Sequence, residues 1–332
     1  MNRLCFSRYA FRCVIAAMLA GCGGSQPPIG APGAVPQTSA SATHADRGKS
    51  WMLPEAKSES LIYATGGCLG TCVFSYPAGK LVGTLDVGFG GSYDFSGDCT
   101  DANGNVFISN NENVFEYAHG GATPIATLEL PGSNAIGCSV DPTTGNLAVV
   151  FSGSGKNVAI FPDATGTPAV YDSDIDSTFC GYDNSGNLFV DGLGSENAPS
   201  LAELPSGGSV FSAISISEAV GFPAQVQWDG QYITIEDATR GNIAVSRLQI
   251  SGSAATIVSA AKFDIHSTAG QSWIFGKNIF IPYGRVSGQK SIGVWKYPKG
   301  GKPTKTIRVT GVYEKTIDFQ AVTFSSNRDH AR

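Results

Sequence analysis

The sequence predicts an all-β fold, and three of its features indicate this. Glycine contributes 42 of the 332 residues, whereas charged residues amount to only 15%. Short segments rich in β-branched and aromatic residues alternate with glycine turns, and a helical spacing of apolar residues is nearly absent. These segments recur with a period of about 40 residues, which is typical of repeat architectures. The low charge and a hydrophobic content of 42% favour a packed core over disorder for most of the chain.

Residues 1–21 have the pattern of an export signal. Three arginines precede the apolar residues 13–20, and this apolar run is too short to span a bilayer. The Leu-Ala-Gly that leads to Cys22 resembles a bacterial lipobox, in which the cysteine is diacylated and becomes the first residue after cleavage. The resemblance implies that Cys22 carries lipid and anchors the chain to a membrane. Gly23 stands where an inner-membrane retention signal has aspartate, which implies the outer membrane.

Residues 22–50 are expected to be the lipidated cysteine followed by a flexible tether. The segment is rich in Gly, Pro, Ala, Ser, Thr and Gln and has almost no large apolar side chain. Such a composition cannot bury enough surface to offset the entropy of ordering the chain. We therefore expect the folded domain to begin at residue 51. No apolar run reaches the roughly 18 residues of a membrane span, which excludes a polytopic membrane protein.

Two signals recur from residue 52 onward, and both give six repeats. One is a strand that ends in an aromatic or aliphatic residue and precedes a glycine turn, as in residues 114–120. The other is a Gly-Asn turn, or a looser copy of it, that leads into an apolar strand. Its glycines are Gly104, Gly145, Gly186, Gly230 and Gly276, the first three spaced 41 residues apart, and the strand at residues 60–63 precedes them as the sixth member of the series.

Short strands at this spacing predict a six-bladed β-propeller with four-stranded blades over residues 51–326. Residues 320–324 match the first, inner strand of a blade without the rest of one, and the first repeat, from Leu61, lacks such a strand. We therefore expect the C-terminal strand to pair into blade one and close the ring, which removes open sheet edges. Residues 327–332 are expected to be a tail.

The order of inner strand, Asp, turn, Gly-Asn and apolar strand resembles the NHL-repeat and gluconolactonase-like six-bladed propellers. Residues 75–85 and 137–149 also resemble a group of uncharacterised bacterial secreted proteins. The gluconolactonase-like resemblance implies one divalent cation in the central channel and a metal-dependent hydrolase of the lactonase type, with Ca²⁺ or Zn²⁺. This sequence departs from that family at its Glu-Gly-Pro motif, where residues 319–321 read Phe-Gln-Ala.

The cysteines of the predicted propeller allow disulfides, because an exported domain meets an oxidising compartment. Cys68 and Cys72 lie in one short loop and are candidates for a small ring. Cys138 and Cys180 occupy matching inner-strand positions of neighbouring blades and are candidates for a bridge. The alternative is that both line the channel as small apolar residues. Cys99 is left without an assigned partner.

Catalytic motifs are not evident. The four histidines are scattered, and no Gly-x-Ser-x-Gly elbow accompanies them, which argues against a Ser-His-Asp triad. Asp101, Asp141 and Asp183 recur with the blade period, so we expect them to cap turns through their carboxylates. We therefore expect no catalysis and no cofactor, with Ca²⁺ as the one candidate ion.

Charge is unevenly distributed along the chain. Residues 81–239 contain twenty Asp or Glu and one basic residue, whereas residues 277–332 contain eleven Lys or Arg and three acidic residues. Six acidic residues fall in interblade loops expected at the channel mouth, where they are candidates for a ligand or metal face: Asp94, Asp98, Asp172, Asp174, Asp176 and Asp264. Five basic residues of blade six are candidates for contact with anionic headgroups: Lys296, Lys299, Lys302, Lys305 and Arg308. In both cases the alternative is an ordinary solvated surface.

These features favour a lipid-anchored propeller of the cell envelope that binds a protein or small-molecule partner through its acidic loop face. We expect a monomer. The alternatives are the lactonase-like hydrolase with its ion in the channel and a purely architectural envelope component. A formal net charge of −5 and the lack of a recognition helix argue against nucleic acid as a partner.

Overall fold

Regular structure in the described part of the chain is almost entirely β-strand. The computed structural model describes residues 49–66, 68, 70–88, 96–152, 155–218, 220–239, 241, 243–265, 270–284, 290–308 and 320–327. Strands β1 to β25 follow one another there, together with the short 3-10 segments η1 (Pro54–Ser58), η2 (Pro162–Ala164) and η3 (Ser195–Asn197). The expected signal peptide, Cys22 and all of the expected tether except residues 49–50 lie outside the described residues.

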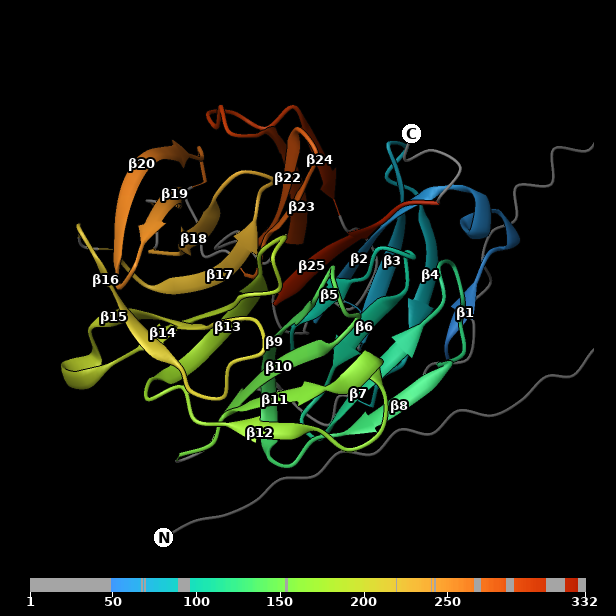
Figure 1. Cartoon of the computed structure of the whole chain (residues 1–332). Helices are drawn as coiled ribbons and strands as arrows, with labels where there is room; N and C mark the ends of the chain where they lie inside the picture. Colours follow the sequence, from blue (N-terminus) through green and yellow to red (C-terminus); the bar gives the residue numbers. More distant parts are fainter. Residues whose placement is uncertain are drawn as a thin grey trace, which may run out of the picture. The chain divides into compact units, whose positions relative to one another are not determined.

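The strands form five hydrogen-bonded sheets within the described residues (Figure 1). The first sheet has the order β1-β4-β3-β2-β25, and the next two have the orders β5-β6-β7-β8 and β9-β10-β11-β12. An eight-stranded sheet follows with the order β13-β14-β15-β16-β20-β19-β18-β17, and the last sheet is β21-β22-β23-β24.

The strands are short, from two residues in β1 to nine in β20. The first sheet contains β1 (Trp51–Met52), β2 (Ser60–Thr65), β3 (Thr71–Tyr76), β4 (Leu81–Leu85) and β25 (Ala321–Ser325). The second and third contain β5 (Asp98–Thr100), β6 (Val106–Ser109), β7 (Asn113–Tyr117), β8 (Ala126–Glu129), β9 (Ser133–Val140), β10 (Leu147–Ser152), β11 (Val158–Phe161) and β12 (Ala169–Tyr171). The eight-stranded sheet contains β13 (Asp176–Tyr182), β14 (Leu188–Leu193), β15 (Pro199–Leu204), β16 (Ser212–Ile216), β17 (Pro223–Trp228), β18 (Ile233–Asp237), β19 (Ala244–Ser251) and β20 (Ala254–Lys262). The last contains β21 (Trp273–Phe275), β22 (Asn278–Gly284), β23 (Lys290–Lys296) and β24 (Lys305–Arg308).

The Gly-Asn turns connect the first strand of a sheet to its second strand, as the sequence predicts. Gly104 and Gly145 have φ angles of +84° and +77°, a region in which a side chain is strained and glycine is not. The strand that follows is buried on both faces. Phe107 of β6 packs in a cluster with Leu147 of β10, whereas its neighbour Ile108 packs in a different cluster with Leu61 of β2. The alternation of side chains along a strand therefore places each sheet between two apolar layers.

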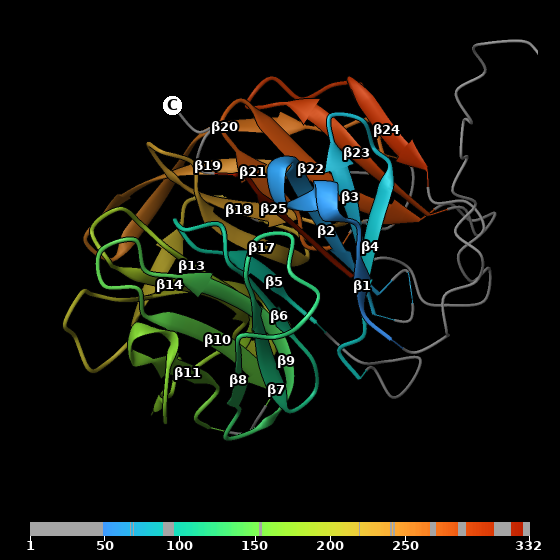
Figure 2. The ribbon, with the colours of Figure 1, turned by 90° about the vertical axis from the view of Figure 1, so that its right-hand side faces the viewer.

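The first strands of successive sheets lie beside one another, which gives a propeller-like arrangement. β25 contacts β5, β5 contacts β9, β9 contacts β13, and β13 contacts β17. Figure 1 shows these strands toward the middle of the described domain, with β8, β12, β20 and β24 farther out, and Figure 2 gives the same ribbon turned by 90°. The carboxamide of Gln227 in β17 hydrogen-bonds both backbone groups of Ile274 in β21, each at 2.8 Å. Gln271, just before β21, bridges in parallel to Ala321 of β25.

The expected pairing of the C-terminal strand with the first repeat is confirmed. β25 pairs antiparallel to β2 over five residue pairs, from Leu61 with Ser325 to Thr65 with Ala321. β2 therefore has a hydrogen-bonded neighbour on each side, because β3 pairs along its other edge. The inner strand of the first sheet therefore comes from residues 321–325, more than 230 positions after the other strands of that sheet.

The sheets differ in two ways from the expected set of separate four-stranded blades. Trp51 and Met52 add a fifth strand, β1, to the outer edge of the first sheet by pairing with Thr84 and Gly83. β16 and β20 pair in parallel, which joins two four-stranded units into the eight-stranded sheet. β20 is nine residues long, so its first residues extend far enough to meet the exposed edge of β16.

Candidate functional site

A cavity of about 650 Å³ lies at the end of the sheets where first strands turn into second strands. We call this end the turn end, and it is defined by the turns at 101–105, 141–146 and 183–187. One group of lining side chains is acidic and comes from the β5–β6 turn, β7, the β9–β10 turn and η2: Asp101, Glu116, Asp141 and Asp163. Another group is aromatic and comes from β6, β21 and β25: Phe107, Trp273, Phe275 and Phe324. No Lys, Arg or His is found among the described residues that line this cavity.

The aspartates of the turn end cap their turns, as the sequence predicts. Asp101 Oδ1 accepts hydrogen bonds from the backbone amides of Asn103 and Asn105, both at 2.8 Å. Asp183 accepts from two amides of its own turn in the same way. Asp141 accepts from the Thr143 amide and hydroxyl and from the Thr144 hydroxyl. These donors hold the Asp101 and Asp141 carboxylates in place at the cavity wall.

Glu116 lies beside Asp101, and one amide side chain bridges the two carboxylates. Asn105 Nδ2 donates to Asp101 Oδ2 at 3.1 Å and to Glu116 Oε1 at 2.9 Å. Partial burial, followed by the negative charge of Asp101, raises the pKa of Glu116, and Asp163 acts in the same direction. The hydrogen bond from Asn105 opposes this rise. Burial is thus the first cause of the raised pKa of Glu116, and the charges of Asp101 and Asp163 add to it.

Two rings of the aromatic wall, Phe275 and Phe324, are in direct contact. Phe324 is stacked on Phe280 at 5.0 Å between ring centroids and lies 4.5 Å from Phe275. Phe275 is 41% exposed although it is a large apolar side chain, and Trp273 is half-buried. The cavity therefore offers an apolar surface opposite a row of carboxylates, a combination common in pockets that hold an amphipathic ligand.

The predicted acidic face lies at the other end of the sheets, the loop end, where one repeat leads into the next. Asp172, Asp174 and Asp176 line an open depression there of about 830 Å³. Asp264 is exposed on the segment before β21, and Asp94 lies outside the described residues. The structure thus brings three of the six predicted aspartates together and places the more enclosed cavity at the turn end.

Asp98, which was expected on an interblade loop, is the first residue of β5 and is fully buried. It therefore does not lie on a loop surface. Thr65 Oγ1 donates to Asp98 Oδ2 at 2.7 Å, and no described residue hydrogen-bonds Asp98 Oδ1. Gln271 spans from the last sheet to the backbone of Asp98, accepting from its N–H and donating to its C=O. Burial raises the pKa of the Asp98 carboxyl to about 7.

Two further buried carboxyls, Asp191 in β14 and Glu236 in β18, were not anticipated from the sequence. Burial raises the pKa of Glu236 to about 7 and that of Asp191 well above its ordinary range. Asp191 Oδ2 and Gln225 Oε1, which lies beside Glu236, have no hydrogen-bond partner among the described residues, whereas Ser272 partly offsets the rise in the pKa of Glu236 through hydrogen bonding. An acidic residue inside an otherwise apolar strand was the available signal. Among the residues that the structure describes, no three His, Cys, Asp or Glu side chains are grouped so that they could hold a metal ion.

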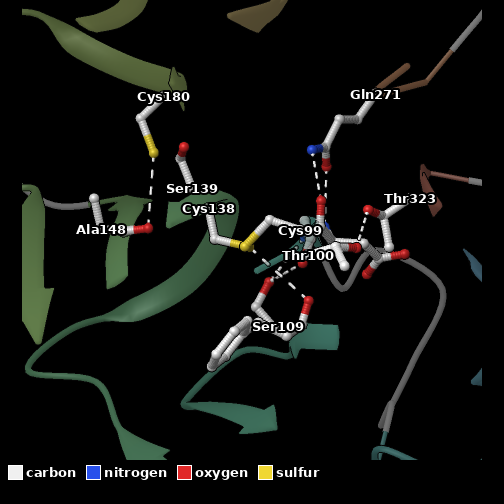
Figure 3. The surroundings of a disulfide bond; sticks show 12 residues. Cys99, Thr100, Ser109, Cys138, Ser139, Ala148, Cys180, Gln271 and Thr323 are labelled. Atoms are coloured by element: carbon white, nitrogen blue, oxygen red, sulfur yellow. Dashed lines mark hydrogen bonds between the residues drawn. A yellow bond between two sulfur atoms is a disulfide. The ribbon is translucent and has the colours of Figure 1, made fainter. Parts of the chain in front are cut away.

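The cysteine pairing agrees with one expected bridge and corrects the other. Cys68 is joined to Cys72, and Cys99 to Cys138 across the inner strands β5 and β9. The expected bridge between Cys138 and Cys180 is wrong, because Cys138 pairs with the preceding inner strand. Cys180 is a buried free thiol that donates to the Ala148 carbonyl at 3.8 Å (Figure 3).

The basic residues singled out in the sequence lie on the β23–β24 hairpin of the last sheet. Lys296, Lys299, Lys302 and Arg308 are exposed, and Lys305 is half-buried. Lys296 Nζ donates to Asn278 Oδ1 at 3.2 Å. Within the described residues, no helix has the length and apolarity needed to cross a bilayer.

Comparisons with known proteins identify the class of fold. No family model matches this chain, and no curated protein matches it in sequence. A chain in a crystal structure of a nidogen–laminin complex is similar, with a TM-score of 0.61 and 12% identity, and the match covers 81% of this chain and 99% of that one. A protein of unknown function from Bacteroides caccae is similar with a TM-score of 0.59 and 11% identity over the same shares of the two chains. The fold is a β-propeller, and at these identities the likeness shows the fold alone.

Proposed function

We propose that this chain is a six-bladed propeller that serves as an exported, lipid-anchored binding module, with the turn-end cavity as its ligand site. The eight-stranded sheet then counts as two blades, since only two residue pairs join β16 to β20. Six clusters of buried apolar residues among the described residues support this count, because each packs between two neighbouring four-stranded units.

One observation carries the proposal of binding: the cavity combines size, an apolar wall and convergent polar groups. Its volume of about 650 Å³ falls within the range of about 300–1,000 Å³ that is usual for small-molecule sites. Propellers host many unrelated functions, so the fold alone does not assign one. We therefore place the ligand site at the turn end and not at the predicted acidic loop face, because carboxylates and aromatic rings line one cavity there.

A cavity-filling variant tests the site without assuming a ligand. Ala102 is exposed and lines the cavity, so Ala102→Trp should obstruct it. Asn184 holds the matching place in the 183–187 turn and does not line the cavity, so Asn184→Trp is the matched control. A library of neutral, anionic and cationic fragments is screened by thermal shift against the full chain in detergent. We expect hits that Ala102→Trp loses and Asn184→Trp keeps, and a screen without such hits would refute the site.

The anchor and the basic hairpin make a further part of the proposal. Lipid on Cys22 would hold the module at a membrane, and lysines near an anionic surface contribute about 1 kcal/mol each. Cys22→Ser removes the proposed anchor, and adding Lys299→Glu, Lys302→Glu and Lys305→Glu should lower the residual binding to phosphatidylglycerol vesicles. The control variant reverses Lys57 in η1, Lys80 in the β3–β4 turn, where it pairs with Glu55, and Lys262 in β20. Equal binding by both triple variants would refute the contact.

A second candidate function is the metal-dependent, lactonase-like hydrolase. The observation that favours it is a pair of buried oxygens without hydrogen-bond partners among the described residues, on Asp191 and on Gln225 beside Glu236, since carboxylate and amide oxygens are ligands for hard cations. Elemental analysis of the purified chain for Ca²⁺ and Zn²⁺ tests it. A stoichiometric ion lost in Glu236→Gln would support this candidate, and a metal-free chain that hydrolyses no lactone with added ion would refute it.

A further inference from the structure

The repeats allow one position to be compared between blades. The turn at the turn end leads into the second strand of each blade. The position is the residue of the third strand that lies opposite the second residue of this second strand. It is Glu116 in β7, opposite Phe107, and Glu203 in β15, opposite Phe189. In β19 it is Arg247, opposite Thr234. In each of these three blades a turn aspartate accompanies it.

In the third of these blades the position is occupied by a cation, the guanidinium of Arg247, and its contacts can be described. Arg247 Nε donates to Asp229 Oδ2 at 2.6 Å, and Asp229 is the turn aspartate of that blade. The guanidinium lies 4.5 Å from the centre of the Tyr232 ring, and Tyr297 donates to the same carboxylate oxygen at 2.8 Å. Although burial opposes ionisation, these hydrogen bonds hold the pKa of Asp229 below its ordinary value. The position is therefore a guanidinium site bounded by a carboxylate and an aromatic face.

At Glu116 the same framework is present and the cation is not. Asp101 is capped by its turn as Asp229 is, but its neighbour on the third strand is a second carboxylate. Asp141 and Asp163 bring the acidic side chains of the cavity to four, and no basic residue is among its described lining. Negative charge concentrated in a cavity with an apolar wall attracts cations strongly, because the low-dielectric wall limits screening.

We propose that the turn-end cavity binds a guanidinium carried on an apolar chain, as in an arginine side chain of a peptide. The guanidinium binds the Asp101 and Glu116 carboxylates on their cavity side, beside the Asn105 amide that bridges them, and it supplies the positive charge that Arg247 supplies to Asp229. Its planar fork of donors suits carboxylates, and its flat face suits the aromatic wall around Trp273. This inference rests on the proposed binding function and adds the chemical class of the ligand.

Three peptides that differ at one side chain test the proposal by calorimetry on the full chain in detergent. They are acetyl-Leu-Arg-Leu-amide, its citrulline analogue, which is neutral and nearly the same shape, and its glutamate analogue. We expect the arginine peptide to bind at least tenfold more tightly than the citrulline peptide, and the glutamate peptide to bind not at all. Comparable binding of the arginine and citrulline peptides would overturn the proposal.

Variants at the compared position separate a local site from general electrostatics. Glu116→Gln should weaken the arginine peptide at least tenfold, and Glu116→Arg, which provides a guanidinium from the chain, should abolish binding. Glu203→Gln removes a matching carboxylate that does not line the cavity, so it should leave the affinity unchanged. Equal weakening by Glu203→Gln and Glu116→Gln would overturn the proposal. If neutral fragments bind in a manner that Ala102→Trp blocks while no arginine peptide binds, the ligand class is wrong and the site remains.

Discussion

Removing the buried charge of Asp98 is expected to stabilise the protein in alkaline solution and not in acid. The carboxyl is fully buried, its one described hydrogen bond comes from Thr65, and no described residue hydrogen-bonds its second oxygen. Asp98→Asn keeps the shape of the side chain and an acceptor for Thr65 while it removes the ionisable group. Burial raises the pKa of this carboxyl from 3.8 to about 7, so the folded protein favours the protonated form.

The sign and size of the effect follow from this shift. Below pH 4 the carboxyl is protonated in both folded and unfolded chains, and its contribution to the free energy of unfolding is fully present. As the pH rises toward 7, the unfolded chain ionises first, so this stability is lost. Each tenfold change in a protonation constant corresponds to about 1.4 kcal/mol, so a rise from 3.8 to about 7 gives a loss of up to about 4 kcal/mol. Glu236 and Asp191 act in the same direction.

Guanidinium unfolding of the oxidised protein at pH 4 and pH 8.5 measures this effect. We expect the advantage of Asp98→Asn over the natural chain to be several kcal/mol larger at pH 8.5 than at pH 4. Asp174→Asn is the control, because Asp174 is an exposed acidic residue, and it should show no such difference. If the two pH values give the same advantage within about 1 kcal/mol for Asp98→Asn, the assignment of a raised pKa to this carboxyl is wrong.

Three further predictions concern stability. Arg247→Ala leaves the fully buried Asp229 carboxylate without its cation, so the free energy of unfolding should fall by about 2–4 kcal/mol by chemical denaturation, with Arg247→Lys intermediate. Replacing both Cys99 and Cys138 by alanine should lower it by about 3–4 kcal/mol, because the bridge closes a loop of 39 residues, and an unchanged midpoint would contradict this bridge. Gly120→Ala should lower the free energy of unfolding by about 2 kcal/mol or more, because φ is +64° and the added Cβ would lie 2.9 Å from the backbone of η1. A melting temperature equal to that of the natural chain would contradict this prediction.

Features of the fold that depend on local sequence were predictable. The glycine turns and the apolar strands after them recur in the sequence, and the unpaired strand at residues 320–324 indicated closure onto the first repeat. The merger of β16 with β20 was not predictable, because it depends on how far the outer strand of one unit reaches toward the next. Spacing also cannot choose among cysteines at matching positions. Cys99, Cys138 and Cys180 lie on successive inner strands, and only the packing of those strands selects the pair.

The site that we propose shares its acidic character with the face predicted from the sequence, but it lies at the other end of the sheets, and the predicted loop face stays a prediction. The count of acidic residues predicted an acidic binding face, and it placed this face on loops such as 172–176, where several acidic residues follow one another in the sequence. Glu116 lies in a strand, and it is a candidate only because Asp101 is beside it. The register of β6 and β7 produces that neighbourhood, which the sequence does not show. Aligning the repeats at the residue before Tyr76, Tyr117, Phe161, Leu204, Leu248 and Tyr297 shows Ser, Glu, Ile, Glu, Arg and Lys, and this change of charge at one position was the signal available.

The pairing of β25 with β2 also has a consequence for synthesis and assembly. Until residues 321–325 are available, β2 presents an unsatisfied edge to whatever strand it meets, including the same segment of another molecule. A chain cut short before this segment is therefore expected to exchange strands between copies or to aggregate. Bringing together segments separated by the whole length of the domain also makes ring completion a slow, late event in folding. Pairing along the open edge of β2 therefore has to wait until synthesis has passed residue 325.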